Sequence, residues 1–485
     1  MNILKDLKPT VVWDYFEQIC QVPRPSKKEE KIIAFLIAFA EEKGLSYKQD
    51  EIGNILISKP ATNGCEDIKS VLLQSHIDMV CEKHAHIKHN FEKDPIIPQI
   101  DGEWVKATGT TLGADDGIGV AAQLALLASS DITHGDIECL FTVDEETGLT
   151  GAFNLKDGFF ESEILLNLDS EDDGELFIGC AGGIDSVATF NIETKDTPEG
   201  YFAFKMEISG LKGGHSGDDI DKGLGNANKI LNRFLWQATR TYGLELHSIK
   251  GGNLRNAIAR EASAVAVVPS SQKEPIRVAF NIYYDELCTE LESTEPGLKM
   301  HLESCDTPKT VFTNEFQTAL LNAIYACPHG VIEMSRKIEG LVETSTNLAA
   351  IKQEGEQLII TTSQRSSVET AKHDIAAMVR SVFELAGAEV EHGDGYPGWA
   401  PNTDSEILKI TRDSYERLFN QKPLVRAIHA GLECGLFLEK YPSLDMISFG
   451  PTIRRAHSPD EMINIETVNK FWLHLLDVLA NIPVK

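Results

Sequence analysis

A histidine and an aspartate stand two positions apart at the end of an apolar stretch. The segment VLLQS at 71–75 is typical of a buried strand, and His76 and Asp78 follow it directly. On an extended backbone, residues i and i+2 face the same side, so an imidazole and a carboxylate would emerge together. The pair indicates metal chemistry, although taken alone it is also explained by a polar strand end that meets a loop.

Acidic residues stand where other segments of the same domain are expected to end. They are Asp115 and Asp116 in the glycine-flanked turn TTLGADDGIG, Glu145 and Glu146 after the strand at 138–143, and Asp169 at the end of the strand at 163–169. In open α/β sheets the carboxyl ends of the strands converge on one crevice. Several carboxylates gathered there would repel one another unless a cation neutralised them.

A second candidate imidazole is His457, in FGPTIRRAHSPDE near the C-terminal end of the sequence. Ser458 and Glu461 match a capping box, and Pro459 would occupy the first helical position. The pattern predicts that a helix begins here and fixes His457 just outside it. A loop histidine beside a helix cap is the alternative interpretation.

Two histidines and several carboxylates, with no cysteine, suit borderline-to-hard divalent ions such as zinc, cobalt or manganese. Five protein ligands are more than one catalytic zinc takes, because such a site keeps a position open for water. Two metal ions that share one carboxylate would use all five.

These residues need a scaffold, and the surrounding segments predict an α/β fold. Apolar residues at helical spacing over 27–43 are followed by Gly44, which suits a helix C-cap. Short apolar strands then alternate with helical patterns, at 54–58, 71–75, 118–129 (a helix), 138–143 and 163–169. This alternation predicts a mostly parallel, twisted sheet covered by helices.

The α/β alternation ends between residues 180 and 200, where a polar stretch leads into a new strand, and this predicts a domain boundary near residue 184. From there to residue 396, two similar passes of a helix followed by paired strands indicate an inserted α+β domain built from a duplicated unit. The segment after 396 returns to the first pattern. We therefore predict a catalytic domain from residues 1–183 and 397–485, with an insertion at 184–396.

Bulk composition excludes several classes of protein. The 485 residues are 42% hydrophobic and 25% charged, which is ordinary for a globular protein, and two or three domains are expected. Forty-five basic against 74 acidic residues give a formal charge of −29, which disfavours nucleic acid and anionic membranes as partners. Nine cysteines without a C-x-x-C pair, and no signal-like or membrane-spanning run, lead us to expect a cytoplasmic protein.

A set of motifs along the whole chain resembles one family. The motifs are VPRPSKKEE, DEIGNILI, HIDMV, TTLGADDGIG, DEETG, NLDSEDDGE, GCAGGID, GLKGGHSG, GGNLRNAIARE, YPGWAPN, HAGLECGLF and GPTIRRAHSPDE. They resemble the aminoacyl-histidine dipeptidases, also described as Xaa-His or cytosolic nonspecific dipeptidases. These belong with the carnosinases among the two-zinc metallopeptidases.

The resemblance implies a function for each candidate in the first domain. Asp115 would bridge two zinc ions, with His76 and Asp169 completing one coordination sphere and Glu146 and His457 the other. Asp78 would hydrogen-bond the His76 imidazole. Glu145 would pass a proton from the bridging water to the leaving amine. Spacing alone leaves open which of Glu145 and Glu146 has which role.

The resemblance also implies that the inserted domain is a lid that closes over the metal ions and contributes substrate contacts. His215 would stabilise the oxyanion, and Asn256, Asn347 and Arg365 would bind the dipeptide backbone and its C-terminal carboxylate. Gly431 would line the same pocket through its backbone. A cis peptide bond is expected after Asp115. The expected substrates are small peptides, including Xaa-His dipeptides such as carnosine. A homodimer is expected, with the alternative that the second of the two duplicated units takes the place of a partner subunit.

Three alternatives remain at this point. A deacylase or tripeptidase could use the same metal-binding residues. A dinucleotide enzyme is suggested only by GIGVAA at 117–122, which no clear strand precedes and which two aspartates accompany. A binding protein without catalysis would not need the seven metal-binding and base residues.

Overall fold

The computed structural model describes residues 3–485, and these fall into two units that each have their own sheet. Unit 1 comprises the described residues up to Gly179 together with Pro401–Ala427 and Leu432–Lys485. Unit 2 comprises Cys180–Ala400 and Ile428–Gly431. Unit 2 therefore interrupts unit 1 along the sequence. Among the described residues, no helix has the length and apolar character needed to cross a membrane.

The sheet of unit 1 has eight strands in the order β1-β2-β6-β3-β7-β21-β8-β20. The strands are β1 (Ser46–Gln49), β2 (Ile55–Lys59), β3 (Val71–His76), β6 (Ile137–Thr142), β7 (Ile164–Asn167), β8 (Glu175–Cys180), β20 (Leu424–Ile428) and β21 (Asp445–Ser448). The central strands β6, β3, β7 and β21 run parallel to one another, whereas β1, β2 and β8 pair antiparallel. Every residue of β3 and β7 is buried, which explains their unbroken apolar pattern. The predicted α/β class is confirmed, with the parallel pairing confined to the centre of a mixed sheet.

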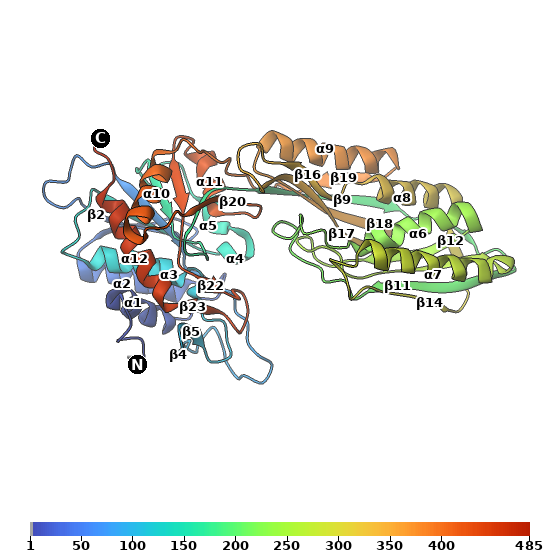
Figure 1. Cartoon of the computed structure of the whole chain (residues 1–485), viewed down its shortest axis with the longest axis horizontal. Helices are drawn as coiled ribbons and strands as arrows, with labels where there is room; N and C mark the ends of the chain where they lie inside the picture. Colours follow the sequence, from blue (N-terminus) through green and yellow to red (C-terminus); the bar gives the residue numbers. More distant parts are fainter. Residues whose placement is uncertain (1–2) are drawn as a thin grey trace. The chain divides into compact units, whose positions relative to one another are not determined.

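Helices from all three segments of unit 1 pack around this sheet (Figure 1). They are α1 (Thr10–Cys20), α2 (Glu30–Lys43), α3 (Ala114–Ala128), α4 (Glu145–Gly148), α5 (Thr150–Asn154), α10 (Glu406–Phe419), α11 (Glu433–Lys440) and α12 (Ile465–Ala480). The predicted end of α2 is confirmed, because Gly44 caps it with a φ of 67°.

The C-terminal loop of unit 1 differs from the sequence prediction. No helix begins at Ser458; residues 458–460 form turns, and the next helix is α12, which Asn464 caps. Strands β22 (Ile453–Arg454) and β23 (Met462–Asn464) stand before and after this loop, and they form a small sheet with β5 (Trp104–Ala107) and β4 (Pro98–Asp101). The capping box fails because the Glu461 carboxylate accepts backbone N–H groups from a distant turn instead.

The sheet of unit 2 is antiparallel, with eight strands in the order β14-β11-β13-β12-β17-β18-β9-β19 and β16 paired to β17. The strands are β9 (Gly182–Asn191), β11 (Tyr201–Ser209), β12 (Glu245–Gly251), β13 (Ala262–Pro269), β14 (Lys299–Ser304), β16 (Gly330–Met334), β17 (Val342–Glu354), β18 (Gln357–Ser366) and β19 (Glu389–His392). A separate two-stranded sheet pairs β10 (Thr194–Asp196) with β15 (Thr310–Phe312).

This sheet consists of two halves with the same β-α-β-β-α-β topology. One half runs β11, α6 (Ala227–Tyr242), β12, β13, α7 (Lys273–Glu290), β14, and the other runs β9, α8 (Asn314–Ala326), β17, β18, α9 (Glu369–Leu385), β19. A short 3₁₀ helix, Ser270–Gln272, precedes α7. In each half the first strand lies between the third and the fourth, and the halves join where Gly251 of β12 pairs with Ile351 of β17.

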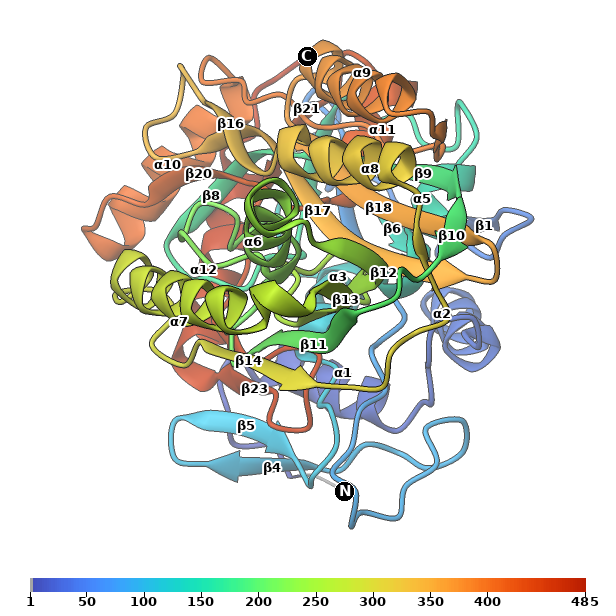
Figure 2. The same cartoon turned by 90° about the vertical axis from the view of Figure 1, so that its right-hand side faces the viewer.

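All four helices of unit 2 share one hydrophobic core with the sheet. Leu231 of α6, Phe280 of α7, Leu320 of α8 and Phe383 of α9 belong to one buried cluster. Figures 1 and 2 show these helices along the same face of the sheet. The hydrophobic core of unit 2 therefore lies between this face of the sheet and the helices.

Candidate metal centre

Six of the predicted residues come together where the parallel strands of unit 1 end. His76 is the last residue of β3, Asp169 follows β7, and Glu145 and Glu146 open α4 after β6. Asp115 stands in the first turn of α3, and His457 lies in the C-terminal loop. The convergence predicted from the strand ends is thus present in the structure, because parallel neighbours end at the same edge of the sheet.

The Asp115 carboxylate lies between the two imidazoles. Its Oδ1 is 3.2 Å from Nε2 of His76, and its Oδ2 is 3.0 Å from Nε2 of His457. Asp169 Oδ1 lies 3.6 Å from the His76 Nε2, and Glu146 Oε2 lies 3.0 Å from the His457 Nε2. One carboxylate therefore links two separate pairs of a histidine and an acid.

These contacts define two possible ligand triplets that share Asp115. The ligand atoms of His76, Asp115 and Asp169 lie within 4.8 Å of one another, as do those of Asp115, Glu146 and His457. Oε1 of Glu146 is buried and has no hydrogen-bond partner among the described residues. Imidazole and carboxylate donors with one unpaired buried oxygen fit two divalent cations.

Glu145 is placed differently from its neighbour. Its carboxylate lies within 4.8 Å of the His76 imidazole and of the Glu146 carboxylate, but it belongs to neither triplet around Asp115. The sequence left open which of the two glutamates would bind metal. The grouping with Asp115 and His457 favours Glu146 as the ligand and leaves the Glu145 carboxylate available beside it.

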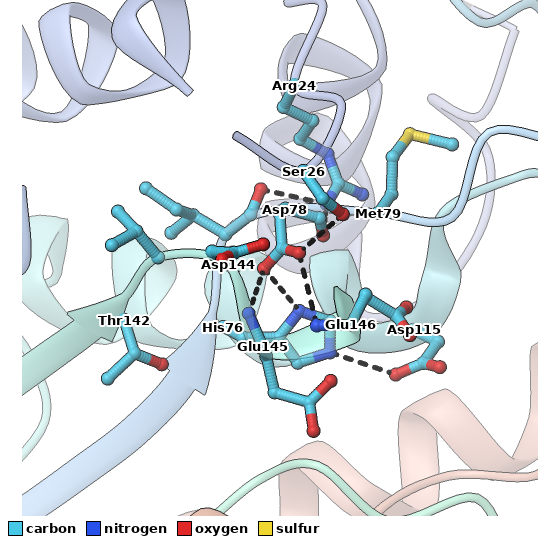
Figure 3. A network of polar contacts seen from close by, with 12 residues as sticks. Arg24, Ser26, His76, Asp78, Met79, Asp115, Thr142, Asp144, Glu145 and Glu146 are labelled. Carbon is cyan, nitrogen blue, oxygen red and sulfur yellow. Dashed lines mark hydrogen bonds and ion pairs between the residues drawn. The ribbon is translucent and has the colours of Figure 1, made fainter. Parts of the chain in front are cut away.

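Asp78 lies behind His76 and is completely buried. Its Oδ1 is 3.4 Å from Nδ1 of His76 and accepts the backbone N–H of Glu145 at 3.0 Å, and its Oδ2 accepts the Ser26 hydroxyl at 2.7 Å. Figure 3 shows the Asp78 carboxylate between the His76 ring and the start of α4. Asp78 thus orients both the imidazole of His76 and the backbone that carries the two glutamates.

The charges of the cluster shift the pKa of its members strongly. Hydrogen bonds that His457 donates to the carboxylates of Asp115 and then Glu146 raise the pKa of His457 to about 11. Burial opposes charge on His76, but Asp169 and Asp115 together hold its pKa well above the usual range. Burial, only partly offset by His76, raises the pKa of Asp169 and of Glu145 well above the ordinary carboxyl range. The carboxylates exceed what the two imidazoles neutralise, and positive charge bound here would relieve the excess.

Glu461 holds the turn that carries Asp115, a contact that the sequence analysis did not predict. Its buried carboxylate accepts the backbone N–H groups of Leu112, Gly113 and Ala114 at 2.7–2.9 Å and that of Asp115 at 3.3 Å. The Asp115–Asp116 peptide bond in this turn is cis, as the resemblance implied. The sequence analysis did single out Glu461, but it assigned the residue to a capping box at the start of a local helix and not to the turn of Asp115.

Arg24 is a second contact that the sequence analysis did not predict. Its buried guanidinium donates to the carbonyls of Ile77 and Asp78 at 3.0 and 2.6 Å, and also to the carbonyl of Gly113. A Cβ at Gly113 would lie 2.6 Å from its Nη2, so the glycine is needed for this approach. Arg24 therefore ties the segment of His76 and Asp78 to the turn of Asp115. In the sequence analysis, Arg24 appeared only as part of the motif VPRPSKKEE, without a role of its own.

The predicted substrate residues of unit 2 form a second polar cluster. Arg365 Nη2 lies 3.5 Å from Nε2 of His215, and its Nη1 donates to the Tyr396 hydroxyl at 3.0 Å. Gly431 faces the same tyrosine, because a Cβ there would lie 2.8 Å from the ring. Arg365 thus contacts His215 on one side and Tyr396 on the other, and Tyr396 in turn contacts Gly431. The sequence analysis did not single out Tyr396.

The two predicted asparagines are placed less directly. Asn347 is fully buried, donates through Nδ2 to the carbonyl of Ala257 at 2.8 Å, and has no partner for Oδ1 among the described residues. The Asn256 side chain is exposed, and its backbone carbonyl accepts the N–H of Ser216 beside His215. Asn256 therefore lies on the loop that contacts the segment of His215, and Asn347 lies in strand β17, which pairs with the strand of Arg365.

Known proteins resemble this chain over most or all of its length. The model of Peptidase family M20/M25/M40 matches residues 72–480. The chain is 44% identical, over all 485 residues and the full length of both proteins, to a cytosol non-specific dipeptidase of Escherichia coli K12. An aminoacylhistidine dipeptidase structure from Vibrio alginolyticus is 47% identical, with a TM-score of 0.92 over 99% of this chain and 98% of that one.

A more distant structure shares the fold. A tripeptidase from Staphylococcus aureus matches with a TM-score of 0.57 at 16% identity, over 98% of each chain. The resemblance predicted from the motifs is confirmed by the full-length relatives. The chain therefore belongs to Peptidase family M20/M25/M40 and is a metal-dependent peptidase of that family.

Proposed function

We propose that this protein hydrolyses dipeptides with a free N-terminus, including Xaa-His dipeptides such as β-alanyl-histidine. The observation that carries the proposal is the Asp115 carboxylate, whose two oxygens reach one histidine each at 3.2 and 3.0 Å. This arrangement suits a two-metal hydrolytic centre. The names of the full-length relatives, both dipeptidases, support dipeptides as the substrate class.

The proposed ligands divide into two sets. His76 and Asp169 would hold one cation, Glu146 and His457 the other, and Asp115 both. Zinc is the first candidate, with cobalt or manganese as substitutes, because imidazole and carboxylate donors without sulfur suit all three. When bound, two such cations supply Lewis acidity that polarises a carbonyl and acidifies water.

Glu145 is the proposed general base and acid. Its pKa is raised by burial and by neighbouring carboxylates, so it can keep a proton that it has removed from the attacking water. It would then deliver that proton to the nitrogen of the leaving amine. Asp78 supports this role by accepting the backbone N–H of Glu145.

The cluster in unit 2 is the proposed source of substrate recognition. Arg365 would bind the C-terminal carboxylate, and His215 would donate to the oxygen that becomes negative in the tetrahedral intermediate. Asn256 and Asn347 would hydrogen-bond the dipeptide backbone. Asn347 supports this role because its buried Oδ1 has no partner among the described residues.

Two related reactions are the alternatives within the same metal chemistry. Proteins named Peptidase T are 30% identical to this chain over 183 residues, which is 32% of its length. A deacylase would use the same cations on an N-acylated amino acid. The dipeptidase is favoured because the 44% identical relative covers the whole chain. We propose a cytoplasmic location because the name of that relative places it in the cytosol. We also propose a homodimer, which a measurement of the mass in solution tests.

The experiment is release of free histidine from alanyl-histidine, β-alanyl-histidine and their N-acetylated forms. Each substrate is assayed before chelation, after chelation and after zinc, cobalt or manganese is returned. Metal-restored cleavage of only the free-amine dipeptides is expected. Cleavage of only the acetylated forms would identify a deacylase, and the absence of any metal-dependent cleavage would contradict the proposal.

A further inference from the structure

Arg365 in unit 2 is a buried cation without a carboxylate partner. Its side chain is 7% exposed, and its guanidinium contacts Tyr396 and His215. Within residues 3–485 it has no ion pair, and its Nε is buried without a hydrogen-bond partner. Asp218 is the carboxylate of this cluster, but its Oδ2 lies 3.3 Å from Nδ1 of His215 and it forms no ion pair with Arg365. Because a buried guanidinium is costly unless an anion contacts it directly, Arg365 can still accept one.

The hydroxyl of Tyr396 is a second donor beside this guanidinium. It accepts a hydrogen bond from Arg365 Nη1 at 3.0 Å, which occupies one of its lone pairs. Its own proton has no acceptor among the contacts of the described residues and can be given to a ligand. Burial raises the pKa of Tyr396 above its usual range, so the hydroxyl keeps that proton at neutral pH.

The ring of Tyr396 is held in place from several sides. Its backbone N–H and carbonyl pair with Gly183 at 2.8 and 3.0 Å, and Lys372 Nζ donates to the same carbonyl at 2.7 Å. A Cβ at Gly183 or at Gly431 would approach the ring to 2.7 or 2.8 Å. Neither glycine has a positive φ, so the backbone conformation does not require glycine at either position. The absence of a side chain instead leaves room for the Tyr396 ring.

We propose that Tyr396 and Arg365 form one carboxylate-binding pair, in which the Tyr396 hydroxyl donates to the C-terminal carboxylate of the substrate. Gly183 and Gly431 leave the space that its ring needs. This inference rests on the proposed dipeptidase function and adds a residue that determines specificity for a free C-terminus. It also changes the role of Gly431, which would position Tyr396 and not contact substrate through its own backbone.

The test compares alanyl-histidine with alanyl-histidinamide for the wild type and for Tyr396→Phe. The affinity is measured as KM, or as an inhibition constant where the compound is not cleaved. Because a hydrogen bond to a charged group is lost, KM for the carboxylate should rise about 10- to 100-fold, with kcat changed much less. The affinity for the amide should not change, so the preference for the carboxylate shrinks by the same factor.

Tyr284→Phe is the matched control. Its hydroxyl donates to the carbonyl of Leu298 at 3.0 Å in the same unit, so the variant loses a tyrosine hydrogen bond outside the cluster. It should keep the wild-type preference. Gly431→Ala is a second variant, whose added Cβ should displace the ring and also reduce the carboxylate preference.

The outcomes separate this inference from the function on which it rests. A wild type that cleaves dipeptides, with an unchanged carboxylate preference in Tyr396→Phe and Gly431→Ala, overturns the inference alone. An equal rise in KM for carboxylate and amide overturns it too, because the ring would then act only through folding. A wild type that cleaves no dipeptide removes both proposals.

Discussion

The two polar clusters of this protein are opposite in chemical character. The cluster in unit 1 consists of carboxylates and imidazoles, with four acids around two histidines and a buried oxygen of Glu146 left without a partner. The cluster in unit 2 is dominated by donors: the guanidinium of Arg365 lies beside the Tyr396 hydroxyl, and the one acid near it, Asp218, contacts His215 and not Arg365. One cluster requires positive charge and the other requires an anion. Changes in the two clusters should therefore be separable in metal content, turnover and substrate affinity.

The largest effect should come from the acid of unit 1 that is not grouped around Asp115. Glu145→Gln removes the proposed proton carrier, and kcat for alanyl-histidine should fall about 100- to 10,000-fold, with KM and metal content unchanged. Turnover and metal stoichiometry are measured on the same preparation.

The neighbouring isosteric change is the control for Glu145→Gln. Glu146→Gln removes a proposed ligand of the cation near His457, so it should lose activity together with bound metal. If Glu145→Gln lost metal as readily as Glu146→Gln did, the two glutamates would not have separate roles. Undiminished turnover in Glu145→Gln would contradict the mechanism outright.

A smaller effect is expected at Glu461, which holds the unit 1 cluster through the backbone. Glu461→Gln keeps the shape but replaces one acceptor oxygen by an NH₂ group that faces backbone N–H groups of residues 112–115. The turn of Asp115 should loosen, and metal affinity should fall about 10- to 100-fold, as for other residues that orient metal ligands. The affinity is measured by competition with a chelator, without any assay of activity.

Glu439→Gln is the control for the loss of charge, since Glu439 is exposed in the same unit. It should bind metal like the wild type. Equal metal affinity in Glu461→Gln would show that the turn keeps its geometry without the carboxylate. At excess metal, Glu461→Gln should recover most of its turnover, whereas Glu145→Gln should not.

The two clusters were not equally predictable from the sequence. His76, Asp115, Glu146 and Asp169 follow or precede apolar elements, and the ends of parallel strands meet at one edge, so local patterns sufficed to predict their convergence. Glu461 and Arg24 act on residues far away in the sequence, and a local pattern cannot report such contacts. Ser458 and Glu461 match the sequence pattern of a capping box, but the Glu461 carboxylate accepts four N–H groups that are distant in the sequence instead.

In unit 2 the pattern of helices and strands was visible, but the contact partners were not. The Tyr396 ring depends on Gly183 and Gly431, which lie 213 and 35 positions away. Nothing in YPGWAPN indicates a ring packed against two glycines. Likewise, the antiparallel pairing of β1, β2 and β8 depends on which strand each one meets, so an apolar run alone predicted a strand and not its direction.

The smallest effect concerns buried histidines, which occur in both units. Burial lowers the pKa of His474 in unit 1, and of His329 and His429 in unit 2, to about 4. The unfolded chain binds a proton at each near pH 6.5 and the folded chain does not, so stability is full above that pH and falls as pH drops toward 4. The free energy of unfolding of the metal-free protein is measured by urea titration between about pH 7 and pH 5. It should fall less steeply in His474→Gln than in the wild type, with a difference in slope of up to about 1.4 kcal/mol per pH unit. The exposed His301→Gln should leave the slope unchanged. An unchanged slope in His474→Gln would mean that His474, which donates to the carbonyl of Thr411 at 2.8 Å, takes up its proton without opening the contact between α10 and α12.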